Sequence, residues 1–329
     1  MTIPSGATPS APRTAGDLAS LNDAYDTEAT PLARAAQHSL LARQKPSPAR
    51  AGGAVPRPRS TRVMVVANQK GGVGKTTTTV NIAAALAQLG QRVLVIDLDP
   101  QGNASTALSV EHRRGVPSTY DALVEGRPLA EVAQPCPDLP TLHVVPATID
   151  LAGAEIELVS VVAREGRLRK AIHGHPLVLT DAAEAAGVDD RFDYVLIDCP
   201  PSLGLLTLNA LVAGEEMLIP IQAEYYALEG LGQLLETVDM VRAHLNPSLA
   251  VSTILLTMYD ARTRLAAGVA EEVRDHFGDQ VLRTAIPRSV RVSEAPSYAQ
   301  TVMTYDPGSA GALSYLEAAR EIAERGAPQ

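Results

Sequence analysis

The chain has 329 residues, of which 46% are hydrophobic. Its 28 basic and 37 acidic side chains give a formal net charge of -9. This negative charge argues, at first sight, against a nucleic-acid partner. This composition supports a packed core and excludes a wholly disordered chain, while two cysteines are too few for a disulfide framework or a Cys-rich metal site. No apolar stretch approaches the roughly 18 residues of a membrane span and the N-terminus has no secretory signal pattern, so we expect a cytoplasmic protein without a membrane partner.

The first 60 residues differ in composition from the rest of the chain. They hold 8 of the 24 prolines and carry seven basic and four acidic side chains, so the tail has a charge of +3 and the remainder -12. Residues 51–59 are typical of a semi-extended linker, and Pro31 to Gln44 could form a short helix that is marginal on its own. We therefore expect a flexible tail and linker over residues 1–60, either disordered or partner-binding, and a folded domain over residues 61–329.

From Val63 onward, continuous apolar runs alternate with helical patterns. Such runs are typical of strands that are buried on both faces of a sheet. The expected strands are Val63–Ala67, Val93–Ile96, Val144–Val145, Tyr194–Ile197, Met217–Ile221 and Thr253–Leu256. An Ala/Leu-rich helix is expected over residues 75–89, ended by Gly90, and a closing helix over residues 311–325. This alternation predicts an α/β fold with a doubly wound, mostly parallel sheet flanked by helices.

A glycine-rich segment connects the first expected strand to the first helix. Its Gly74-Lys75-Thr76 part matches the end of a phosphate-binding P-loop, in the strand–loop–helix setting that the motif requires. Glycines let several backbone N–H groups point at one anion, and the helix N-terminus adds a partial positive charge. Lys75 would contact the β- and γ-phosphates of ATP, and the Thr76 hydroxyl would bind Mg²⁺. The expected nucleotide-binding residues of the loop are Lys70, Gly71, Gly72, Val73, Gly74, Lys75, Thr76 and Thr77.

The start of this loop departs from the usual P-loop pattern. Gln69 stands where the first glycine should be, and a second lysine, Lys70, follows it. The chain has only four lysines (Lys45, Lys70, Lys75 and Lys170), so two of them in one loop point to a function. The arrangement resembles the deviant Walker A loop of the ParA/MinD group of P-loop ATPases. The resemblance implies that Lys70 contacts the nucleotide of a partner subunit in an ATP-dependent homodimer; the alternative is a solvated loop charge.

Two expected strands end in aspartates. Alternate strand residues face the same side, so Asp97 and Asp99 can both face the phosphate loop, where a carboxylate can orient water or hold Mg²⁺ through water. The resemblance implies that Asp99 supports hydrolysis, with Asp97 in a supporting role; the alternative is that Asp99-Pro100 only opens a turn. A later strand ends in Asp198, which matches the Walker B pattern and predicts a contact to Mg²⁺ through water. The expected catalytic residues are thus Lys70, Lys75 and Asp99, and the expected metal ligands are Thr76, Asp97 and Asp198.

The resemblance becomes closer when the segments are taken together. Four segments stand in the order seen in chromosomal ParA partition ATPases: Lys70–Thr77, Asp97–Asn103, Asp198–Ser202 and Thr257–Thr263. The match covers about residues 62–325. It implies slow, partner-stimulated ATP hydrolysis by a homodimer that binds nonspecific double-stranded DNA and is released by a ParB-like centromere-binding protein. On this basis we expect a nucleoid-associated protein that segregates a chromosome or a plasmid.

Two segments could supply DNA contacts despite the acidic composition. Arg262 and Arg264 follow an expected strand, and Arg288 and Arg291 lie in a later segment with no carboxylate between them. Such a cluster would bind phosphates without sequence preference and with a strong salt dependence; the alternative is that these are ordinary solvated arginines. The resemblance also places the segment around Pro287 next to the adenine, so Pro287 is an expected nucleotide contact.

Other P-loop functions are alternatives. A MinD-like membrane ATPase would need a basic amphipathic C-terminal helix, whereas the expected last helix carries three glutamates against two arginines. An iron–sulfur or arsenite-pump relative would need a suitable cysteine pair, which Cys136 and Cys199 do not provide. A metabolic ligase would need a second group of polar residues for its substrate, and none stands out. A positioning ATPase for another cargo would use the same residues, and the tail could bind DNA, a polar scaffold or nothing.

Overall fold

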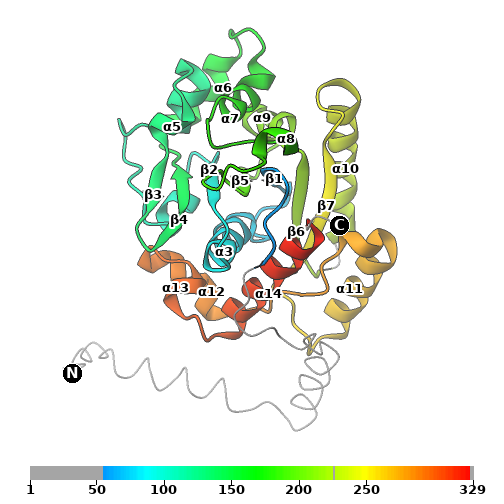
Figure 1. The fold of residues 1–329 in the computed structure, drawn as a ribbon. Helices are drawn as coiled ribbons and strands as arrows, with labels where there is room; N and C mark the ends of the chain where they lie inside the picture. The colour runs from blue at the N-terminus through cyan, green and yellow to red at the C-terminus, as the bar shows by residue number, and fades with distance from the viewer. Residues whose placement is uncertain (1–54, 225–226, 327–329) are drawn as a thin grey trace, which may run out of the picture. The chain divides into compact units, whose positions relative to one another are not determined.

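The computed structural model describes residues 55–224 and 227–326, which belong to one compact unit built on a seven-stranded sheet (Figure 1). The strands lie in the order β3-β4-β2-β5-β1-β6-β7, and neighbours are parallel except for β3 and β4 at one edge. The strand bounds are β1 Arg62–Val66, β2 Val93–Asp97, β3 Gln134–Cys136, β4 Leu139–Val145, β5 Tyr194–Asp198, β6 Glu216–Gln222 and β7 Ala250–Thr257. The prediction of a doubly wound, mostly parallel sheet is confirmed.

Helices cover both faces of this sheet. The side chains of α6, α7, α9, α10 and α11 contribute to a core on one face, and those of α3, α4, α12, α13 and α14 contribute to a core on the other. The helix bounds are α3 Lys75–Gln88, α4 Asn103–Ala107, α5 Leu129–Val132, α6 Leu151–Leu158, α7 Arg167–His173, α8 Ala182–Ala185, α9 Leu205–Ala213, α10 Ala227–His244, α11 Arg264–Phe277, α12 Val290–Glu294, α13 Val302–Tyr305 and α14 Ala310–Arg325. Within the described residues there are also short segments of other helix types: η1 Asp121–Glu125, η2 Arg164–Gly166, η3 Gly278–Gln280 and η4 Ala295–Tyr298.

Strand β1 shows how one apolar run serves two cores. Val63 and Val65 pack into the core under α9 and α10, while Met64 and Val66 pack into the core under α3 and α14. All four side chains are fully buried, because successive strand residues point to opposite faces of a sheet that is covered on both sides.

Both long helices expected from the sequence are present. Helix α3 ends before Gly90, whose positive φ of 87° suits the left-handed turn after a helix. The closing helix α14 packs on the core through Tyr315 and Ile322, which are buried, but Leu313 is 55% exposed and does not belong to the packed face. Within the described residues, no helix has both the length and the apolar content needed to cross a membrane.

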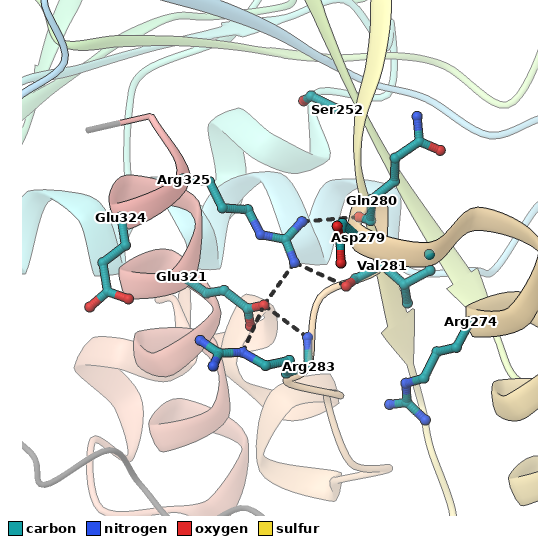
Figure 2. A pocket seen from close by; sticks show the side chains of 10 residues that line it. Ser252, Arg274, Asp279, Gln280, Val281, Arg283, Glu321, Glu324 and Arg325 are labelled. Atoms are coloured by element: carbon teal, nitrogen blue, oxygen red, sulfur yellow. Dashed lines mark hydrogen bonds and ion pairs between the residues drawn. The ribbon is translucent and has the colours of Figure 1, made fainter. Parts of the chain in front are cut away.

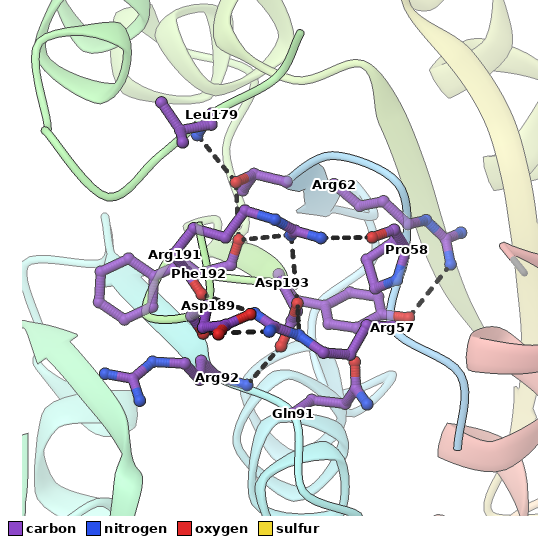
Figure 3. A network of polar contacts seen from close by, with 12 residues as sticks. Arg57, Pro58, Arg62, Gln91, Arg92, Leu179, Asp189, Arg191, Phe192 and Asp193 are labelled. Atoms are coloured by element: carbon purple, nitrogen blue, oxygen red, sulfur yellow. Dashed lines mark hydrogen bonds and ion pairs between the residues drawn. The ribbon is translucent and has the colours of Figure 1, made fainter. Parts of the chain in front are cut away.

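Residues 55–61, which we call the N-terminal strap, lie against the domain, although the sequence predicts a flexible linker up to residue 60 (Figure 3). The carbonyl oxygen of Val55 accepts a hydrogen bond from Gln91 Nε2 at 3.2 Å, and the Thr61 hydroxyl donates to the Phe192 carbonyl at 2.6 Å. Val55 itself is buried in the core under α3. The rest of the expected tail, with its short helix at residues 31–44, lies outside the described residues.

A buried carboxylate anchors this strap. Asp193, which precedes β5 and is fully buried, accepts hydrogen bonds from Arg57 Nε at 2.8 Å, from Arg191 Nη1 at 3.2 Å and from the backbone N–H of Arg92 at 2.9 Å. Arg191 also donates to the carbonyl oxygen of Pro58. The two guanidinium groups compensate the buried charge, so the strap is fixed by a partner 136 residues away in the sequence.

Candidate functional site

The glycine-rich loop joins β1 to α3 at the carboxyl edge of the sheet, where crevices of open α/β sheets bind ligands. Gly72 and Gly74 have φ values of 76° and 85°, a region that residues with a side chain rarely adopt. A Cβ atom on Gly71 or Gly72 would meet no other atom within 4 Å, so the loop is open at this point. The local sequence therefore builds the concave backbone that a phosphate requires.

Lys75, the first residue of α3, lies at the base of this loop. Its side chain is largely buried, and Nζ donates a hydrogen bond to the Lys70 carbonyl oxygen at 3.3 Å. Burial lowers the pKa of Lys75, and the nearby Asp198 acts in the opposite direction. A partly desolvated cation is thus held close to the place where phosphates would lie.

Asp198, at the end of β5, has one oxygen that is not used by the protein. Oδ1 accepts a hydrogen bond from the Thr79 hydroxyl at 2.8 Å, whereas Oδ2 is buried without a hydrogen-bond partner among the described residues. Burial raises the pKa of Asp198 to about 8, the neighbouring Asp97 adds to this rise, and the Thr79 and Thr76 hydroxyls oppose it. A free carboxylate oxygen close to Thr76 fits a hydrated Mg²⁺, which prefers few protein oxygens and keeps its waters.

Asp97 pairs with Asp198 on the neighbouring strand but directs its oxygens elsewhere. Oδ2 accepts from the backbone N–H and the hydroxyl of Ser105 at 2.9 and 2.7 Å, and Oδ1 accepts from the Asp99 N–H at 3.1 Å. Burial raises the pKa of Asp97 to about 6, although the hydrogen bonds from Ser105 lower it. In this geometry Asp97 fixes the start of α4 and the position of Asp99, and its role at the metal stays a prediction.

Asp99 lies beyond the end of β2, where it is 9% exposed. Its Oδ1 accepts from the N–H of Gln101 at 3.0 Å, and no described residue donates to Oδ2. One oxygen therefore orients the side chain while the other can hold a water, which is what the predicted role in hydrolysis needs.

Lys70 forms an ion pair within its own chain. Nζ lies 3.1 Å from Oε2 of Glu224, which follows the end of β6. The Lys70 N–H donates to Asn68 Oδ1 at 3.0 Å, and Asn68 Nδ2 donates to the Pro220 carbonyl at 2.9 Å. The start of the phosphate loop is thus attached to the neighbouring strand.

The structure brings the two predicted arginine segments together. Tyr259 pairs with Pro287 in an isolated bridge, and the backbone N–H of Arg288 donates to the Tyr259 carbonyl at 3.2 Å. The four guanidinium groups differ in their surroundings: Arg262 pairs with Asp260 at 2.9 Å and Arg291 with Glu294 at 3.4 Å, while the exposed side chains of Arg264 and Arg288 make no ion pair with a described residue.

A separate cavity of about 800 Å³ lies near the start of β7, between α11 and α14 (Figure 2). Glu321 is buried there and accepts from Arg325 Nη2 at 2.8 Å and from the backbone N–H of Arg283 at 2.9 Å. The charged side chains of its lining balance: Arg274, Asp279, Arg283, Glu321, Glu324 and Arg325. None of the predicted site residues lines this cavity.

Sequence reasoning missed four residues that shape the site: Asn68, Thr79, Ser105 and Glu224. Thr79 follows Lys75 by one helical turn, and this spacing is the one signal that could have identified it. Asn68 and Ser105 lie two and eight residues from Lys70 and Asp97, the residues that they hold, whereas Glu224 is 154 residues from Lys70 and only the sheet brings the two together.

The sequence of this chain is similar to a known protein family and to individual relatives. A family model described as an AAA domain matches residues 61–251. The chain is 49% identical over 265 residues to the sporulation initiation inhibitor protein Soj of Bacillus subtilis, covering 80% of this chain and 99% of Soj. It is 50% identical over 268 residues to the chromosome partitioning protein ParA of Myxococcus xanthus, covering 82% and 90%.

A solved structure extends the comparison to bound ligands. The cobyrinic acid a,c-diamide synthase of Mycobacterium smegmatis, crystallised with ADP and magnesium, has 38% sequence identity and a TM-score of 0.63, and the match covers 79% of this chain and 92% of that one.

Proposed function

The chain belongs to the ParA/Soj family of chromosome-partitioning proteins, and we propose that it is an ATPase switch that dimerises with ATP, binds nonspecific DNA and is reset by hydrolysis. One observation carries the proposal: the open phosphate loop holds two lysines, and one of them, Lys75, lies near Asp198, whose Oδ2 has no hydrogen-bond partner among the described residues. A simple phosphate-binding loop would need only Lys75.

The proposed cofactors are ATP and Mg²⁺, whose site the residues present fit. The N–H groups of the loop and Lys75 would hold the phosphates, and the Thr76 hydroxyl and Asp198 Oδ2 would hold the hydrated ion. When bound, Mg²⁺ supplies charge neutralisation between the β- and γ-phosphate oxygens. Pro287, beside Tyr259, is proposed as a contact to the adenine.

Hydrolysis is assigned to a water oriented by Asp99. Its Oδ1 is fixed by the Gln101 N–H, so Oδ2 can accept a proton of the attacking water. Asp97, held by Ser105, keeps the backbone of Asp99 in place. Phosphoryl transfer depends mainly on position and charge compensation, so a site that still lacks a partner contribution is expected to be slow.

Dimerisation is assigned to Lys70, which would contact the nucleotide of the second copy. Its exposed side chain and its position at the start of the loop support this role. A centromere-binding protein of the ParB type would then stimulate hydrolysis and separate the two copies. The same switch could position another cargo, and the tail, which lies outside the described residues, is proposed to contact a polar scaffold.

DNA binding is assigned to the arginines on both sides of the Tyr259–Pro287 bridge, and the protein would accordingly associate with the nucleoid. Because Arg264 and Arg288 make no ion pair with a described residue, both can contact phosphates without losing an internal partner. We expect the double substitution Arg264→Glu and Arg288→Glu to weaken DNA binding at least 10-fold, or about 1.4 kcal/mol, through lost phosphate contacts, while the basal ATPase rate is kept. Equal substitutions at Arg113 and Arg242, which are exposed elsewhere, are the control.

The deciding experiment is a DNA-binding titration with ADP, with ATP and with a nonhydrolysable ATP analogue, each at two salt concentrations. The proposal expects tight binding only with ATP or the analogue, and a strong loss of affinity at the higher salt. Binding that is absent with every nucleotide would rule out a DNA-bound switch.

A metabolic synthase is the second candidate, because the solved relative of 38% identity carries a synthase name. Such an enzyme would couple ATP hydrolysis to a small-molecule substrate and would gain nothing from DNA. An ATPase rate that rises with cobyrinic acid, and not with DNA plus a ParB-type protein, would favour this candidate.

A further inference from the structure

The Lys70–Glu224 ion pair connects two adjacent strand ends. Lys70 follows β1 and Glu224 follows β6, and these strands are neighbours in the sheet. The two side chains are 36% and 47% exposed, so each can reach solvent or a partner without unfolding any element.

Both members of the pair are held in place by further hydrogen bonds. Asn68, which is buried, accepts from the Lys70 N–H and donates to the Pro220 carbonyl in β6. The second carboxylate oxygen of Glu224 accepts from Gln222 Nε2. The contact is therefore a supported geometry and not a meeting of two free side chains.

We propose that Glu224 holds Lys70 within its own subunit and thereby sets the protein concentration at which the ATP-bound chain dimerises. This inference rests on the proposed function, in which Lys70 contacts the nucleotide of the second copy. A phosphate of the other chain that contacts the Lys70 ammonium would lie next to the Glu224 carboxylate, and the repulsion between these two anions favours release of Lys70 from Glu224. Formation of each dimer is therefore linked to the opening of two such pairs.

The Lys70–Glu224 ion pair is weak enough to shift the dimer dissociation constant without preventing dimerisation. Exposed ion pairs contribute little free energy because water and salt screen them. The closed form of one Lys70–Glu224 pair is therefore favoured over the open form by at most about fivefold. Two copies open two pairs, which makes a combined effect of up to about 25-fold on the dimer dissociation constant. The effect should fade at high salt, where the pair itself weakens.

The test is the isosteric substitution Glu224→Gln, with dimer formation measured by light scattering over a range of protein concentrations. A saturating nonhydrolysable ATP analogue keeps the nucleotide affinity out of the result. We expect the dissociation constant to fall about 3- to 25-fold at low salt, and the difference from the wild type to shrink at high salt. Glu131→Gln is the matched control, because Glu131 forms a similarly exposed ion pair with Arg127 far along the chain.

A second pair of variants separates the inference from the function on which it rests. Lys70→Ala should stay monomeric, and Lys70→Ala combined with Glu224→Gln should also stay monomeric. If Lys70→Ala dimerises like the wild type, the proposed dimer itself is wrong. If Lys70→Ala is monomeric but Glu224→Gln leaves dimerisation unchanged, or restores it in the double variant, Glu224 does not act through Lys70 and the inference fails. Glu224→Ala, which removes the carboxylate, decides the same question if the glutamine variant folds poorly.

Discussion

Strand β5 has a buried aspartate beside each of its ends, and the two differ in how they are neutralised. Asp193, just before the strand, is surrounded by Arg57, Arg191 and a backbone N–H. Asp198, at the carboxyl end, accepts a hydrogen bond from one hydroxyl on Oδ1, and no described residue donates to Oδ2. Both side chains are 0% exposed, so burial alone does not distinguish them.

The difference lies in where the compensating charge comes from. At the amino end of β5, Arg57 and Arg191 supply the positive charge, and the result is a fixed contact between the N-terminal strap and the sheet. At the carboxyl end Asp198 is left under-compensated, and its raised pKa is the sign of that. A buried carboxylate with a free oxygen in a crevice indicates a binding site, whereas one with all its partners indicates structure.

The largest expected effect concerns Asp193, at the amino end of β5. Asp193→Ala would leave Arg57 and Arg191 without their shared carboxylate, and we expect it to lower the free energy of unfolding by about 3–5 kcal/mol. Urea denaturation followed by circular dichroism measures this. Nucleotide affinity of the folded fraction should be unchanged, and a stability close to the wild type would show that the strap contact is dispensable.

The next effect concerns nucleotide binding. Lys75→Ala removes the cation from the base of the phosphate loop, so we expect ATP affinity to fall at least 100-fold, or about 2.7 kcal/mol. The stability of the nucleotide-free chain should change little. Calorimetric titration with ATP checks the affinity, and Lys170→Ala, at an exposed lysine, is the control.

A smaller effect is expected on turnover. Asp99→Ala should keep ATP binding but lower the hydrolysis rate by roughly 100-fold, the lower range for a positioned proton-accepting group. Phosphate release in single-turnover conditions measures it, and the variant should accumulate as an ATP-bound dimer. An unaltered rate would remove Asp99 from the mechanism.

The smallest expected effect is a pH dependence that belongs to Asp198. Its folded-state pKa of about 8 lies above the unfolded value, so the folded chain binds the extra proton between about pH 4 and 8. Stability without metal therefore falls as the pH rises, by at most about 2 kcal/mol between pH 6 and 8. Asp198→Asn should be less pH-dependent than the wild type when both are denatured by urea at pH 6 and 8 with a chelator. Identical pH profiles would contradict the assignment.

The sequence predicts the parts of this fold that depend on local pattern. The strands are found because continuous runs such as Val93–Ile96 have few alternatives, and the phosphate loop because its glycines and Lys75 form one local motif. Strand β3 is missed because Gln134-Pro135-Cys136 is short, partly polar and paired only at the sheet edge.

The features that the sequence did not predict depend on contacts between residues that lie apart in the chain. The strap depends on Arg57 finding Asp193, and the resting position of Lys70 depends on Glu224, 154 residues later. The hydrogen bonds that Ser105 donates to Asp97 across the turn into α4 were not predicted, and the expected role of Asp97 at the metal stays a prediction. No local pattern contains these pairings.

The strap also has a mechanical consequence. Strand β1 carries the phosphate loop at its far end, and the chain enters β1 directly from the strap. A pulling force applied through the residues before Val55 would first load the contact of Val55 with Gln91, and then the bonds of Arg57 to Asp193 and of Arg191 to the Pro58 carbonyl. The load would thus be shared with the centre of the sheet, and the phosphate loop would keep its shape while the tail is under tension.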